Sequence, residues 1–329
     1  MLEKIQDLPK QLEDGWKNKW EKEPDFKDKK FKKILISGMG GSAIAGHLLK
    51  ELLKDEDLFI DVWSDYQLPN WVDESDTLVI ALSYSGDTEE MVGAVNLAIQ
   101  NDISVIAITS GGKLEELAKK HNLPLLKIDY TSPPRAAIGW LYSSLMKAVC
   151  EVGLAKSIEK EFDKALEALK EAVEKKAMVE KTEELALSLS NKIPVFLTYS
   201  PLTGVAKRIV NQLNENSKTF SAAFNFPEAC HNFIVGLEFP APEKIVILFL
   251  ESNYAFSRNV AREKIIQELV GSKEIPFIPL SVASTNLLSE QLLFIYFGDL
   301  LSYYLAGVYG VDPTPIESIT FLKDKLKNI

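Results

Sequence analysis

The 329-residue sequence has little cysteine, histidine and arginine, and each scarcity excludes a class of site. Its two cysteines, Cys150 and Cys230, lie far apart, which argues against a disulfide framework or a cysteine zinc site and favours a reducing compartment. With only three histidines, no His/Cys cluster is available for a metal ion, so we expect a site without metal or cofactor. Only four arginines occur, so an arginine at a special position is notable.

The chain also lacks a long apolar run and an excess of positive charge. Residues 1–33 are charged and contain no signal-peptide core, and the clearest apolar run, residues 245–250, has the length of a buried strand. We therefore expect a cytoplasmic protein that does not enter a membrane. The net charge of −10 argues against a nucleic-acid partner. Lysine and glutamate supply most of the charge, a pattern that favours a thermophilic source.

What the sequence does contain is a glycine-rich turn at residues 34–54 (ILISGMGGSAIAGHLLKELLK), between a predicted buried strand and a predicted helix. Gly38, Gly40 and Gly41 allow a tight turn and a close approach of the backbone. Ser42 is predicted to lie where the helix starts, beside free amide groups. A helix N-terminus of this kind favours an anion, most simply a phosphate.

Alternating strands and helices predict the fold class, an α/β protein with two parallel sheets. In the first half we expect strands at 33–37, 58–62, 77–82, 103–109 and 124–128, and helices at 42–54, 88–100, 113–121 and 135–151. In the second half we expect strands at 193–198, 244–250 and 275–280, and helices at 205–216, 257–270 and 284–306. The predicted organisation is a helical segment at 1–30 (a helix over 2–22), a domain at 31–152, a Lys/Glu-rich helical connector at 153–190, and a domain at 191–329.

A second loop rich in hydroxyl groups follows the strand at 77–82. Ser83, Ser85 and Thr88 precede a predicted helix and could bind a phosphate together with the first loop. The alternative is that these hydroxyls only form the turn, with Asp87 or Thr88 capping the helix. A similar loop at 109–112 could equally be a plain turn.

These motifs resemble a known family. GMGGSAIAG at 38–46, followed by SYSGDTEE at 83–90, resembles the sugar isomerase (SIS) domain. Two such units in a chain of this length resemble the phosphoglucose isomerase superfamily, and its short bifunctional phosphoglucose/phosphomannose isomerases match best. The resemblance implies two flavodoxin-like SIS domains, each an α-β-α sandwich. It also implies that the sugar phosphate is bound by positions that match the family's Ser/Thr loops, namely Gly41, Ser42, Ser83, Ser85 and Thr88.

Arg135 follows two prolines that open a predicted helix. Proline there is ordinary helix initiation, but a guanidinium beyond the end of a parallel strand can stabilise negative charge on a reacting oxygen. The Pro-Pro pair before this arginine resembles the bifunctional branch, whereas classical phosphoglucose isomerases have two glycines.

Glu215, in the segment Asn214-Glu215-Asn216, is the candidate general base. A single glutamate at a helix end is usually solvated. The following residues 219–238 are apolar and nearly uncharged, and a carboxylate beside them would be partly desolvated, with the raised pKa that a base for a carbon acid requires. The resemblance gives the matching glutamate the role of moving a proton between C1 and C2.

Three further positions match the family towards the C-terminus. A lone histidine is more often structural, but the resemblance makes His231 the ring-opening group and implies a homodimer in which its loop reaches the partner subunit's site. Lys323 could simply be exposed on a final amphipathic helix, and the resemblance pairs it with the histidine. Thr314 is the candidate for acceptance of mannose 6-phosphate.

Together these features predict an aldose–ketose isomerase that interconverts glucose 6-phosphate or mannose 6-phosphate with fructose 6-phosphate through a cis-enediolate. Glycolysis and gluconeogenesis are the expected context. One alternative is a non-catalytic sugar-phosphate-binding SIS regulator, although no basic helix-turn-helix is evident. Another is an isomerase of a different sugar phosphate, because the phosphate loops do not recognise the sugar. An amide-transferring glucosamine 6-phosphate synthase would need a glutaminase domain, which this sequence lacks.

Overall fold

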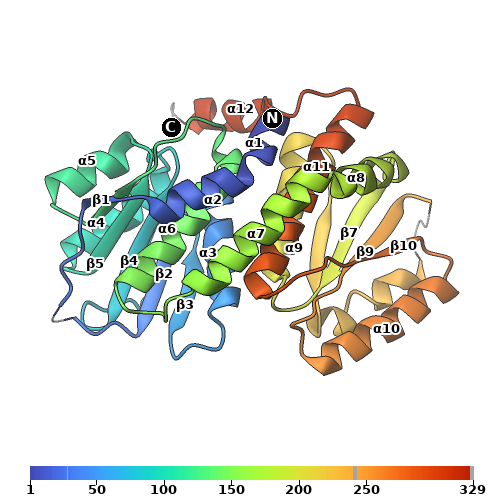
Figure 1. Cartoon of the computed structure of the whole chain (residues 1–329), viewed down its shortest axis with the longest axis horizontal. Coiled ribbons are helices and arrows are strands. Elements are labelled where there is room, and N and C mark those ends of the chain that lie inside the picture. The colour runs from blue at the N-terminus through green and yellow to red at the C-terminus, as the bar shows by residue number, and fades with distance from the viewer. Residues whose placement is uncertain (28, 240–242, 327–329) are drawn as a thin grey trace.

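Two β-sheets, one from each half of the chain, organise the computed structural model, which describes residues 1–27, 29–239 and 243–326. Figure 1 shows the first half of the chain on the left and the second half on the right, with helices between and around the sheets. This arrangement confirms the predicted α/β fold class with two parallel-sheet units. The exact domain boundaries remain a prediction.

The first sheet has six strands in the order β1-β6-β5-β4-β2-β3, parallel except where β1 pairs with β6. Its strands are β1 (Trp20–Lys22), β2 (Lys33–Ser37), β3 (Phe59–Trp63), β4 (Thr77–Ser83), β5 (Ser104–Thr109) and β6 (Leu125–Lys127). Its helices are α3 (Gly40–Leu52), α4 (Glu89–Gln100), α5 (Gly112–Lys120), η1 (Pro134–Ala136) and α6 (Ile138–Glu151).

Register in this sheet brings the predicted loops to one edge. All seven residues of β4 are buried, as expected for a parallel strand covered on both faces. Ser37 at the end of β2 lies opposite Ala81, and Ser83 at the end of β4 lies opposite Thr109. Because the carboxyl ends of parallel strands meet at this edge, the first and second loops are neighbours there.

The second sheet is fully parallel, in the order β10-β9-β7-β8. Its strands are β7 (Ile193–Thr198), β8 (Ala222–Asn225), β9 (Ile245–Leu250) and β10 (Phe277–Leu280). Its helices include α9 (Thr203–Asn216), η2 (Glu228–His231), η3 (Val235–Glu238) and α10 (Ser257–Ser272). Strand β8 was not predicted, because this short edge strand has no buried residue and lacks the apolar run of a central strand.

The N-terminal segment differs from the single helix predicted over 2–22. It forms α1 (Leu2–Gln6), α2 (Leu8–Lys17) and then strand β1. Pro9 has no amide hydrogen and cannot continue a helix, so a new helix starts around it. Trp20 pairs with Leu126, and β1 thereby covers the otherwise open edge of β6.

The connector forms α7 (Glu159–Lys175) and α8 (Ala177–Ser188), which pack against α11 (Leu287–Val308). The chain was predicted to lack an apolar segment long enough to cross a membrane. That prediction was wrong, because α11 is long and apolar enough when only its length and composition are considered. In this structure 78% of its apolar window is buried. The apolar run is continuous because α11 is covered on several sides, by α7, α8 and α9.

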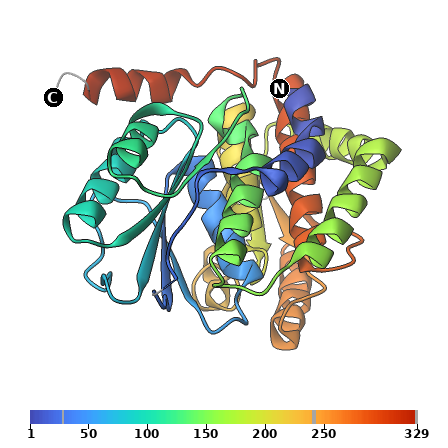
Figure 2. The same cartoon turned by 60° about the vertical axis from the view of Figure 1, so that its left-hand side comes forward.

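The last helix, α12 (Glu317–Leu326), confirms the predicted C-terminal helix but has no buried residue. In Figure 2 it projects from the end of α11 and lies over the first half of the chain. Its apolar side chains are therefore exposed in the single chain; they include Ile319, Phe321, Leu322 and Leu326.

Candidate active site

The glycine-rich loop connects β2 to α3 at the carboxyl edge of the first sheet. A Cβ atom at Gly38 would lie 2.8 Å from the carbonyl oxygen of Leu82, so the close approach predicted for this glycine is present. The helix begins at Gly40, which makes Ser42 its third residue rather than its cap. Ser42 is buried in the N-terminal turn, where an anion is favoured, and its own amide donates to the carbonyl of Met39 at 3.0 Å.

The second loop brings its hydroxyl groups together. Ser83 Oγ lies 3.1 Å from Thr88 Oγ1 and accepts a hydrogen bond from the amide of Gly86 at 3.1 Å. The side chain of Ser85 is exposed at the same edge.

The alternative for this loop was correct for the turn and wrong for the cap. Ser83 and Ser85 accept hydrogen bonds from the amides of Gly86 and Asp87 within the turn. Thr88 precedes α4 without a side-chain bond to its amides, and Asp87 instead accepts from the amide of Lys113 at the start of α5. In the third loop, Thr109 Oγ1 donates to the carbonyl of Gly111 at 2.9 Å, and Ser110 Oγ donates to the carbonyl of Tyr84 in the second loop at 2.6 Å. Among the described residues, no side chain caps the first turn of α4. Its amides therefore lie without a side-chain acceptor at the edge of the sheet where we predict that the phosphate binds.

Arg135 links the first half of the chain to the second. Its side chain is 4% exposed. Nε donates to Asn216 Oδ1 at 2.7 Å, and Nη2 donates to the carbonyl oxygens of Pro313 at 2.7 Å and Thr314 at 2.9 Å. A Cβ atom built on Gly41 would lie 3.5 Å from the Cα of Arg135, so the arginine is adjacent to the glycine-rich loop.

Glu215 lies at the end of α9, on the other side of this guanidinium. Its Oε2 atom is 3.8 Å from Arg135 Nη1, and its side chain is 25% exposed. Burial raises the pKa of Glu215, while the charges of Arg135 and Arg208 oppose that rise. The carboxylate therefore has the desolvated character predicted from the sequence.

The groups that surround Glu215 are different from those predicted. It lines a cavity of about 650 Å³ together with residues between Val311 and Ile319. The segment at 219–238, which was expected to desolvate it, is largely at the surface, with Phe220 73% exposed. The expectation that residues 219–238 desolvate Glu215 was therefore wrong, because residues 311–319 lie beside it instead.

A buried polar network that was not predicted from the sequence supports the backbone of Arg135. Arg208 on α9 donates to the backbone carbonyl of Arg135 at 3.1 Å and to Asp299 Oδ2 at 2.6 Å. Gln212 donates to the other oxygen of Asp299 at 3.0 Å. The available signals were the scarcity of arginine and a lone aspartate within the otherwise apolar run of α11.

The remaining predicted residues divide into two groups. Thr314 is placed at the site, because its carbonyl oxygen contacts Arg135. His231 ends η2 and Lys323 lies on α12, and both side chains are exposed. In the described part of this single chain, no hydrogen bond or ion pair joins either of them to Glu215 or Arg135. Within the same residues, no group of three or more potential metal ligands occurs.

Comparison with known proteins identifies the family. Residues 178–326 match the family described as bacterial phospho-glucose isomerase C-terminal SIS domain. The bifunctional phosphoglucose/phosphomannose isomerase of Caldicellulosiruptor bescii is 36% identical over 100% of this chain and 99% of its own length. That of Aquifex aeolicus is 32% identical over 95% of this chain and 97% of its own length.

Among solved structures, a hypothetical protein from Thermus thermophilus matches over 99% of this chain and 87% of its own, with a TM-score of 0.72 and 14% identity. That likeness supports the two-unit fold. The full-length sequence matches support the resemblance drawn from the glycine-rich and serine-rich loops, and the chain belongs to the family of bifunctional phosphoglucose/phosphomannose isomerases.

Proposed function

We propose that this chain is an aldose–ketose isomerase that interconverts glucose 6-phosphate or mannose 6-phosphate with fructose 6-phosphate. The observation that carries the proposal is the pairing of Glu215, a partly buried carboxylate with a raised pKa, with a buried Arg135 beside the glycine-rich loop. A sugar phosphate anchored at the start of α3 would present its carbonyl end towards these two groups. The full-length relatives carry the same activity in their names.

In the proposed mechanism the phosphate binds Gly41, Ser42, Ser83, Ser85 and Thr88. The carboxylate of Glu215 takes the proton from C2 of the aldose, which leaves a cis-enediolate with its charge on O1 and O2. The hydroxyl proton of O2 passes to O1, and the carboxyl group of Glu215 returns its proton to C1, which gives the ketose. Rotation about the C2–C3 bond would present either C2 epimer to this one base.

Arg135 is suited to the charged intermediate because two of its three nitrogens already have partners. Nε and Nη2 are committed to Asn216 and to two backbone carbonyls, which fix the plane of the guanidinium. Among the described residues Nη1 has only Glu215, at 3.8 Å, and can donate to a reacting oxygen placed between them. A fixed donor of this kind stabilises charge without reorganising during the reaction.

The proposal assigns His231 and Lys323 to ring opening in a homodimer, with His231 reaching the partner subunit's site. Its support is the exposed apolar surface near His231, where Val235 is 64% and Phe239 98% exposed. The exposed apolar residues of α12, which carries Lys323, add to it. Surfaces of this kind are commonly covered by another protein.

We further propose a cytoplasmic role in glycolysis and gluconeogenesis, with Thr314 shaping the acceptance of mannose 6-phosphate. The contact of the Thr314 carbonyl with Arg135 supports a place near the reacting carbons. The Lys/Glu-rich composition and the two free cysteines support a thermophilic source and a reducing compartment.

A coupled assay starting from fructose 6-phosphate, with glucose 6-phosphate and mannose 6-phosphate followed separately, tests the activity. Glu215→Gln should abolish both products while a non-reacting sugar phosphate still binds, because the phosphate loops are unchanged. Glu180→Gln, on the exposed face of α8, is the matched control. Normal turnover by Glu215→Gln would remove the base, and binding without turnover by the unaltered chain would favour the regulator.

Mixed dimers test the shared site. Combining Glu215→Gln subunits with His231→Ala subunits rebuilds one complete site per mixed dimer only if the histidine comes from the partner. Random pairing makes half of the dimers mixed, so about a quarter of the original activity should return from two inactive parents. No recovery in dimers shown to be mixed would place the histidine in the site of its own subunit.

A further inference from the structure

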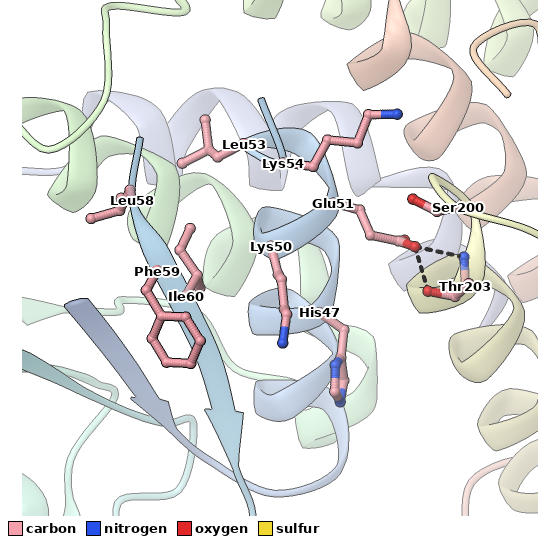
Figure 3. A pocket seen from close by; sticks show the side chains of 10 residues that line it. All are labelled: His47, Lys50, Glu51, Leu53, Lys54, Leu58, Phe59, Ile60, Ser200 and Thr203. Carbon is pink, nitrogen blue, oxygen red and sulfur yellow. Dashed lines mark hydrogen bonds between the residues drawn. The ribbon is translucent and has the colours of Figure 1, made fainter. Parts of the chain in front are cut away.

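The second half of the chain has its own strand–turn–helix opening, at residues 199–204 between β7 and α9, and the proposed mechanism gives it no role. The amides at the start of α9 are already occupied. Thr203 and Gly204 donate to the two carboxylate oxygens of Glu51, each at 3.0 Å, and the hydroxyl of Thr203 also donates to Glu51. Figure 3 shows this contact at the wall of a cavity of about 510 Å³.

Glu51 belongs to the other half of the chain, near the end of α3. It is only 8% exposed, so the contact is a buried bridge between the halves. Burial raises the pKa of Glu51, while its hydrogen bonds from Thr203 and Gly204 oppose that rise, as does the positive end of the helix dipole.

The two helices approach closely at this point. A Cβ atom at Gly204 would lie 3.1 Å from the backbone carbonyl carbon of His47 on α3. Lys207 Nζ lies 2.8 Å from His47 Nε2, and burial together with Lys207 lowers the pKa of His47 to about 4, which leaves a neutral ring to accept from the ammonium. The contact of Glu51 with α9 is thus part of a tight junction.

The opposite ends of the same two helices form the candidate active site. The start of α3 carries Gly41 and Ser42, where the substrate phosphate is proposed to bind. The end of α9 carries Glu215, the proposed base, with Asn216 bound to Arg135. The separation between phosphate and base therefore depends on how α9 is placed along α3.

We propose that Glu51 is a positioning residue for the isomerase reaction: by holding the start of α9 on the end of α3, it sets the distance between the phosphate loop and Glu215. The inference rests on the proposed function of Glu215. Glu51 touches no substrate and acts only through α9. Losing it would let α9 shift while the phosphate loop, at the far end of α3, keeps its own contacts.

Glu51→Ala tests this role through a split between kcat and KM. A base misplaced by about 1 Å can cost about a hundredfold, so kcat should fall by about tenfold or more. KM should change by less than about twofold, because phosphate binding is retained. Glu51→Gln, which keeps one acceptor for an amide, should recover part of kcat. Asp55→Asn removes an exposed carboxylate from the turn after α3 and should behave as the unaltered enzyme.

Amide hydrogen exchange gives a readout that does not need turnover. In Glu51→Ala and Glu51→Gln, peptides covering 203–208 should exchange faster, and so should peptides covering 209–217. Faster exchange confined to 203–208, or unchanged kcat in both variants, would overturn the positioning role. If the unaltered chain proves not to be an isomerase, the proposed function fails, and exchange at 209–217 still decides whether Glu51 controls the far end of α9.

Discussion

Replacing Arg135 with lysine is the most informative single perturbation of this site. The substitution keeps a positive charge but removes the planar fork by which Arg135, in the first half of the chain, binds the second half. Arg135 donates from two nitrogens to three acceptors, the side chain of Asn216 and the carbonyls of Pro313 and Thr314. A lysine ammonium is a compact charge and cannot reach these acceptors in the same plane.

The structure sets the size of the effect on stability. Hydrogen bonds from a charged donor contribute about 1.5–3 kcal/mol each. If lysine keeps one of the three bonds, two are lost, and the free energy of unfolding should fall by about 3–6 kcal/mol. The oxygen of Asn216, which is fully buried, would lose its charged donor.

The effect on catalysis should be larger than loss of stability explains. Nη1 is the nitrogen left for the reacting oxygen, and removing one such donor typically reduces kcat by about a hundredfold to a thousandfold. KM should change little if the phosphate loops hold the substrate on their own. The loop at 312–314 should also loosen, because at least one of its two carbonyls loses its donor.

The coupled assay measures kcat and KM, and urea unfolding measures the free energy of unfolding. Limited proteolysis should cut Arg135→Lys faster within 311–316 than the unaltered chain. Arg258→Lys, at an exposed position on α10, is the control. We expect kcat to fall about a hundredfold in Arg135→Lys. If this variant unfolds with an unchanged free energy and keeps kcat within about threefold of the original, the Arg135 guanidinium does not hold the site together.

Further predictions follow from the neighbouring groups. Because the pKa of Glu215 is raised above 4.5 and the base must be ionised, the acid limb of kcat/KM should lie above pH 4.5. Between pH 4.5 and the folded-state pKa, Glu215 keeps a proton in the folded chain that it has lost in the unfolded chain. The free energy of unfolding should therefore fall as pH rises through this range, and Glu215→Gln should lack this fall in thermal unfolding. Asp299→Asn leaves Arg208 buried without its carboxylate partner and should cost about 3–5 kcal/mol in urea unfolding, with normal stability contradicting the network. Thr314→Gln should reduce mannose 6-phosphate formation more than glucose 6-phosphate formation in the coupled assay, and an unchanged ratio would remove its specificity role. EDTA should leave the rate unchanged, and a loss restored by added metal would contradict the mechanism.

Structure could be predicted from the sequence where it depends on residues that lie next to each other in the chain. The buried strands of the first sheet and the loops at their carboxyl ends are encoded by apolar runs, glycines and hydroxyl residues next to each other. Strand β2 was predicted with its observed bounds, Lys33–Ser37, because its apolar run ends at Gly38. Short-range patterns of this kind need no knowledge of the tertiary structure.

Contacts between distant segments could not be predicted in the same way. Nothing near Arg135 in the sequence indicates that it binds the carbonyls of Pro313 and Thr314, nearly 180 residues away. The desolvation of Glu215 was inferred from the segment next to it, while its actual neighbours come from 311–319. The residues of strand β1 were predicted as part of a helix. They form a strand because pairing with β6 outweighs local propensity.

The two halves contribute opposite ends of similar helices, and this would explain how the proposed chemistry is divided between them. The start of α3 offers amides and a positive dipole end to a phosphate, while Glu215 lies near the negative end of α9. A negative helix end disfavours ionisation of a carboxyl group, as burial does, so both act in the direction that a base for a carbon acid needs. At the start of α9 the polarity is reversed, and there a carboxylate, Glu51, serves as a fixed contact rather than a reactant. In the proposed mechanism the same strand–turn–helix unit therefore binds an anion at one end or holds a base at the other. The packing of α3 on α9 would bring one of these functions from each half into a single site.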